Sequence, residues 1–68
     1  MERRHLTLSA HRTTISLEPE FWKAIEHLSG GEWREWVRDT LVNKPGETGR
    51  GVWLRCQVLS VYRGLLSG

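Results

Sequence analysis

Polar and apolar residues alternate along the first seventeen residues, in two segments whose alternation is out of phase. The apolar-facing set is Leu6, Leu8 and Ala10 in the first segment and Thr13, Ile15 and Leu17 in the second. Side chains on a strand point to opposite faces with a period of two, so one flat strand cannot bury both sets on the same face. The pattern predicts a strand over 11–17, preceded by residues 1–10 as either a separate arm or an extension beyond a β-bulge.

From Pro19 onward the apolar positions recur at helical spacing and predict three helices, over 19–29, 32–42 and 52–66. Proline suits the first position of a helix, and the Gly30-Gly31 pair is typical of a helix end. The intervening segment 43–51 holds one proline and three glycines, which indicates a loop. The apolar face of the last helix is wide enough to predict a central position, with part of that helix against a partner subunit.

The predicted fold is therefore mainly α-helical with one short strand that has no pairing partner in its own chain. Exposed strand edges with unmet N–H and C=O groups favour pairing. We expect two copies to pair antiparallel about a two-fold axis, which makes the chain a homodimer. The expected dimer core consists of Ile15, Leu17, Phe21, Ile25, Leu54 and Val58.

Length and composition support an oligomer. Sixty-eight residues make one small domain, and such a domain buries too little surface to be comfortably stable alone. The single Cys56 excludes an internal disulfide and is expected to act as a small buried hydrophobe on the last helix. The three histidines are scattered without ligand spacing, so we predict no metal site and no cofactor.

Other protein classes find little support in the sequence. No apolar run approaches membrane-spanning length and the first residues lack a secretory core, so we expect a cytoplasmic chain with no membrane partner. A phosphate-binding glycine loop and a nucleophile motif are also lacking, so no enzyme is predicted. Trp22, Trp33 and Trp36 could stack on bases, but their helical spacing favours packing in the core or an interface.

Charge is distributed unevenly. Three arginines against one glutamate give residues 1–14 a net charge of +2, and three arginines give residues 50–68 a charge of +3. The middle segment 15–49 has four basic and seven acidic residues. Basic ends of this size favour a polyanionic partner.

The outward face of the expected strand suits DNA recognition. If Ile15 and Leu17 point inward, Arg12, Thr14 and Ser16 point outward, and the major groove admits a two-stranded β-ribbon. Arginine pairs bidentately with guanine, and the hydroxyls of threonine and serine bond several base edges. The alternative without a binding role is that these residues are polar only because an exposed face of a sheet is usually polar.

The stretch "HRTTISLEPEFWKAI", followed much later by "LRCQVLSVYR", resembles the ribbon-helix-helix family, and within it a bacterial subfamily with a similar opening. The likeness implies a regulator of transcription that binds double-stranded DNA as a homodimer, or as dimers stacked along DNA, with Arg12, Thr14 and Ser16 contacting bases. It also implies a phosphate anchor at the second helix, around Gly31, Glu32 and Trp33. Because Glu32 departs from the family pattern, Arg34, Arg3 and Arg4 are alternative contacts to the DNA backbone. His11, at the start of the strand, is either a further phosphate contact or an exposed side chain without a role.

A second interpretation of the sequence stays open. The long last helix and the tryptophan-rich second helix would also suit a protein-interaction module, such as an antitoxin or adaptor that binds a protein partner while DNA binding is secondary or absent.

Overall fold

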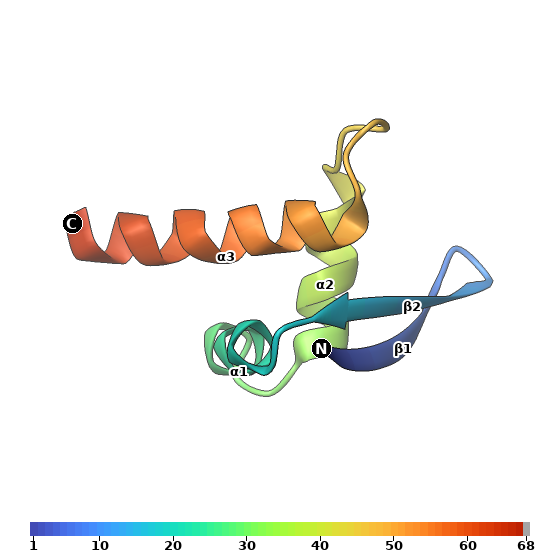
Figure 1. The fold of residues 1–68 in the computed structure, drawn as a ribbon, viewed down its shortest axis with the longest axis horizontal. Helices are drawn as coiled ribbons and strands as arrows, with labels where there is room; N and C mark the ends of the chain where they lie inside the picture. Colours follow the sequence, from blue (N-terminus) through green and yellow to red (C-terminus); the bar gives the residue numbers. More distant parts are fainter. Residues whose placement is uncertain (68) are drawn as a thin grey trace.

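The computed structural model describes residues 1–67, which form a two-stranded hairpin followed by three helices (Figure 1). Strands β1 (Glu2–Leu8) and β2 (His11–Leu17) pair antiparallel, with Leu8 opposite His11 and Glu2 opposite Leu17. In Figure 1 the turn of the hairpin extends away from the helices, on the side opposite to the C-terminal end of the last helix.

The hairpin corrects two expectations. Strand 11–17 does have a partner in its own chain, and residues 1–10 are neither an arm nor a bulged extension. Ser9 and Ala10 form the turn, with φ of 47° and 68°, as the favoured two-residue hairpin turn requires at both positions. This reversal pairs even-numbered residues with odd-numbered ones, so the two out-of-phase apolar sets lie on the same face.

Helix α1 (Pro19–Leu28) begins at the expected proline and ends one residue before the expected boundary. Its end is stabilised by glycine. Gly30 has a φ of 64°, the Gly31 N–H donates to the Glu26 carbonyl, and the Gly30 N–H donates to the His27 carbonyl. These two bonds are those of a Schellman motif, which explains the glycine pair after this helix.

Helix α2 (Trp33–Val42) leads through a loop to α3 (Arg50–Ser67), which begins two residues earlier than the sequence suggests. The difference comes from Gly51, which the sequence assigned to the preceding loop because glycine is typical of loops. A Cβ at Gly51 would lie 3.6 Å from the Ser16 carbonyl oxygen and 3.8 Å from the Leu17 side chain, so the small residue lets the first turn of α3 approach β2 closely. The Trp53 indole also donates to the Thr40 carbonyl, which joins α3 to α2.

The core lies between the inward face of the hairpin and all three helices. Its buried members are Leu6, Ile15, Leu17, Trp22, Ile25, Val37, Leu54 and Val58. Five of the six residues assigned to a dimer core are therefore buried within a single chain, and Phe21 is half-buried against them. Their part in a dimer core stays a prediction, since the structure holds a single chain.

Cys56 and Trp22 were both expected to be buried, and the structure confirms this for Trp22 alone. Cys56 is exposed rather than buried, because the adjoining stripe of α3, with Leu54 and Val58, is the one that faces the core. Trp22 is fully buried and donates its indole N–H to the Glu2 carbonyl at 2.8 Å, so it acts as a core residue. Within residues 1–67, no helix combines the length and apolar character needed to cross a bilayer.

Candidate nucleic-acid interface

The outward face of the hairpin is polar and contains no carboxylate. The register places Arg3 opposite Ser16, His5 opposite Thr14, and Thr7 opposite Arg12, all on the face that points away from the core. The predicted residues Arg12, Thr14 and Ser16 thus share this face with three residues of β1, of which only Arg3 had been considered for DNA contact. The alternation of β1 could have assigned His5 and Thr7 to the outward face, but only once the turn at Ser9 and Ala10 is known.

The three predicted base-contacting residues differ in accessibility. Arg12 and Thr14 are exposed, whereas Ser16 is half-buried near the start of α3. The Thr14 hydroxyl and His5 Nδ1 are hydrogen-bonded at 2.8 Å across the two strands. This bond holds both side chains on the same face, where hydroxyl and imidazole groups can bond base edges or phosphate oxygens.

Arg3 and Arg4, both considered for the DNA backbone, have opposite orientations. Arg3 is exposed on the outward face. Arg4 points inward, with Nε 2.7 Å from the Glu2 carboxylate and a terminal nitrogen 2.6 Å from the Glu26 carboxylate. Its guanidinium also lies 4.8 Å from the Trp22 ring centre and 5.0 Å from that of Trp33.

The surroundings of Arg4 keep it charged and engaged. Desolvation lowers the pKa of Arg4, but the hydrogen bonds to Glu2 and Glu26 outweigh this effect and the net pKa lies above its ordinary value. With both carboxylates bound, this arginine joins β1 to α1 and is not counted among the proposed DNA contacts. The expectation for Arg4 is thus corrected, because its charge is neutralised within the chain.

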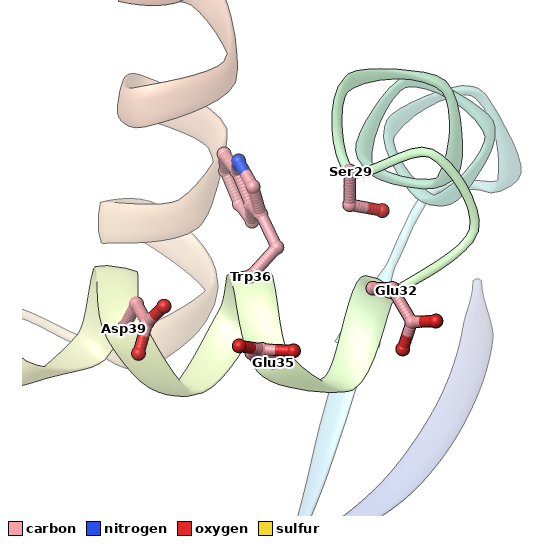
Figure 2. Close-up of a pocket in the computed structure, with 5 residues that line it drawn as sticks. All are labelled: Ser29, Glu32, Glu35, Trp36 and Asp39. Carbon is pink, nitrogen blue, oxygen red and sulfur yellow. The ribbon is translucent and has the colours of Figure 1, made fainter.

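The N-terminus of α2 is acidic. Glu32 precedes the first residue of the helix and its side chain makes no capping hydrogen bond there. Glu32, Glu35 and Asp39 line one shallow pocket together with Ser29 and Trp36, and Figure 2 shows the three carboxylates following the same side of the helix. Such a strip repels phosphate. Gly31 is exposed with a φ of 94°, and Trp33 is half-buried with its ring 5.4 Å from that of Trp22.

A basic cleft occupies a different side of α2, between that helix and β1. It has a volume of about 350 Å³ and is lined by His5, Leu6, Thr7, Arg12, Arg34 and Arg38. Arg38 donates from Nε to the Thr7 carbonyl at 3.1 Å, and the Arg34 guanidinium lies 4.5 Å from the Trp33 ring centre. Arg34 was among the predicted backbone contacts. Arg38 was not, because nothing in the sequence indicates that α2 lies beside β1.

His11, the last of the predicted backbone contacts, is exposed at the turn end of β2, opposite Leu8. It therefore lies at the end of the hairpin that extends away from the helices (Figure 1).

Most of the large apolar side chains on the surface belong to α3. They are Val52, Leu59, Val61, Leu65 and Leu66, with exposed fractions between 39% and 87%. Arg55 joins this helix to the segment before α1 through a 2.8 Å ion pair to Glu18, and this hydrogen bond lowers the pKa of the Glu18 carboxyl.

Comparison with known proteins identifies the family of this fold. A family model described as a ribbon-helix-helix domain matches residues 1–44, which include the hairpin, α1 and α2. No curated protein and no solved structure matches the chain.

Proposed function

The chain belongs to the ribbon-helix-helix domain family, and on that premise we propose that it binds double-stranded DNA sequence-specifically as a homodimer and regulates transcription. The family is typically one of DNA-binding transcriptional regulators and antitoxins, generally without enzymatic activity. The observation that carries the proposal is the outward face of the hairpin, which is polar and basic, free of carboxylates and turned away from the core.

In the proposed complex, Arg12, Thr14 and Ser16 of β2 read bases in the major groove. Arg12 is exposed and takes part in no ion pair within residues 1–67, so its guanidinium is available for a guanine edge.

The proposed dimer forms through the edge of β2 that does not face β1. Among residues 1–67 the sheet contains only these two strands, so that edge of β2 has no strand beside it. Because the start of α3 approaches β2 at the Ser16 carbonyl, pairing would use the part of this edge nearer the turn. Antiparallel pairing with the same edge of a second copy would bring two sets of base-reading side chains together at the centre of a four-stranded sheet. Reading by two related sets implies a palindromic or nearly palindromic site.

The test is an Arg12→Ala variant, compared with a Lys23→Ala variant that removes a positive charge from the exposed surface of α1. A duplex enriched from a random pool by the wild-type protein serves as probe in gel-shift titrations at one salt concentration. We expect Arg12→Ala to fold and to lose about 1–3 kcal/mol of discrimination between the enriched duplex and a scrambled one. If Arg12→Ala retains the affinity and specificity of Lys23→Ala, the proposed base-reading role is wrong.

A second candidate function is a protein-interaction module, such as an antitoxin, and the exposed apolar side chains of α3 favour it. Val52, Leu59 and Leu66 recur at intervals of seven residues and so lie along one side of α3, and an exposed apolar stripe on a small chain often marks a site of protein contact. Stoichiometric co-purification with another protein, combined with no salt-dependent affinity for any duplex, would support this candidate over the first.

A further inference from the structure

The cleft between β1 and α2 concentrates positive charge that the chain itself does not neutralise. Three guanidinium groups line it, from Arg12, Arg34 and Arg38, and no aspartate or glutamate is among the lining residues. Within residues 1–67, none of these three arginines takes part in an ion pair, in contrast to Arg4 and Arg55. A cluster of cations without a counter-charge suits an anion from outside the chain.

Two of these arginines lie one turn apart on the same helix. Like charges at positions i and i+4 destabilise a helix slightly, by a few tenths of a kcal/mol. For Arg34 and Arg38 this repulsion would be relieved by a bound anion.

The same two side chains are held in position before any ligand arrives. Arg38 is held by its Nε bond to the Thr7 carbonyl, and its terminal nitrogens make no hydrogen bond within residues 1–67. Arg34 is held by its contact with the Trp33 ring. The planar guanidinium matches the oxygens of a phosphate group bidentately, so two pre-positioned arginines are well suited to hold one.

The cleft also borders the base-reading face. His5, Thr7 and Arg12 belong to both surfaces, since they lie on the outward face of the hairpin and line the cleft. In a four-stranded dimer sheet, three strand spacings of about 4.8 Å would place the two β1 strands about 14 Å apart. The major groove is only about 12 Å wide, so β1 and the cleft beside it would meet the phosphates that border the groove.

We propose that this cleft is a binding site for a DNA backbone phosphate, in which Arg34 and Arg38 contact the phosphate oxygens. The inference rests on the proposed DNA binding and assigns the phosphate contact to these side chains, where the family likeness implied the N-terminus of α2. The acidic strip of Glu32, Glu35 and Asp39 explains the difference, because it keeps phosphates away from the other side of that helix (Figure 2).

The experiment compares an Arg34→Gln/Arg38→Gln double variant with Lys23→Gln, in titrations of two duplexes over a range of salt concentrations. One duplex carries the enriched site and the other a scrambled site. We expect the double variant to bind both duplexes more weakly by a similar factor, at least about tenfold. The slope of log K against log salt should fall by about 1 for each phosphate that the variant no longer neutralises. Arg34→Lys/Arg38→Lys, which keeps the charge, should restore most of the slope and part of the affinity.

Each other outcome has a distinct meaning. If the wild-type protein binds DNA and the double variant matches Lys23→Gln in affinity and slope, the proposed phosphate-binding site is wrong while the proposed function stands. Weaker binding confined to the enriched duplex would also overturn it, because that pattern indicates base reading. If the wild-type protein binds neither duplex, the proposed function fails and this inference fails with it. Circular dichroism of each variant verifies that weaker binding does not come from unfolding.

Discussion

Neighbouring arginines on β1 have opposite roles, although nothing in their identity distinguishes them. Arg3 points outward and is exposed, whereas Arg4 is held inward by Glu2 and Glu26 and lies against Trp22. The alternation of the strand alone makes the difference, because adjacent residues point to opposite faces. Arg4 therefore contributes to the stability of the fold, whereas the neighbouring Arg3 is available for the proposed DNA binding.

We predict that Arg4→Ala lowers the free energy of unfolding by about 1–2 kcal/mol, because it removes two partly exposed ion pairs and two cation–π contacts. Arg3→Ala is the matched control and should change that free energy by less than about 0.5 kcal/mol. Urea denaturation followed by circular dichroism measures both. Equal destabilisation by the two variants would contradict the assigned orientations.

At the scale of elements, the hairpin turn is formed by residues that do not favour it. Ser9 and Ala10 both adopt positive φ, where residues with a Cβ are strained and the usual sequences are Asn-Gly or Asp-Gly. This explains why residues 1–10 were not recognised from the sequence as a hairpin strand.

Ala10→Gly should therefore stabilise the protein by about 1 kcal/mol, since glycine adopts a φ of 68° without steric cost. The same substitution in α1, Ala24→Gly, should destabilise it by about 1 kcal/mol or more, because glycine weakens a helix interior. Thermal melting of the two variants gives shifts of opposite sign if the turn is as described. A lower melting temperature for Ala10→Gly would indicate that Ala10 does not have this conformation.

On the scale of the whole molecule, the buried core combines the hairpin with all three helices of one chain. Helix α3 lies outside the region matched to the family, yet it supplies Leu54 and Val58 to the core and is joined through Arg55 to Glu18, the residue before α1. The dimer that we propose forms through the edge of β2 that does not face β1.

The register identifies which residues of β2 point their N–H groups to that edge. Residues that flank a two-residue turn form a hydrogen-bonded pair and such pairs alternate, so Thr13 bonds toward β1 and Thr14 points its N–H to the open edge. Consistent with this alternation, the Thr7 carbonyl points away from β2 and accepts the bond from Arg38.

Thr14→Pro should thus keep the fold and shift the protein from dimer to monomer in sedimentation velocity, because proline is tolerated at an edge but cannot donate across it. Thr13→Pro removes a hydrogen bond within the hairpin and should destabilise the fold by about 1–3 kcal/mol. A Thr14→Pro protein that sediments as the wild type does would refute dimerisation through this edge.

The sequence by itself determined the local elements and their inward faces, because the periodicity of apolar residues is a property of consecutive positions. It predicted three helices, the strand that ends at Leu17, the family, and the outward placement of Arg12, Thr14 and Ser16. Only the tertiary structure decided how segments distant along the chain meet. The pairing of β1 with β2, the engagement of Arg4 by Glu26 and the cleft that joins Arg38 to Thr7 all depend on the turn at Ser9 and Ala10 and on helix packing. The single chain folds back on itself at that turn because a buried face shared by two strands outweighs the strain of two unfavourable backbone conformations.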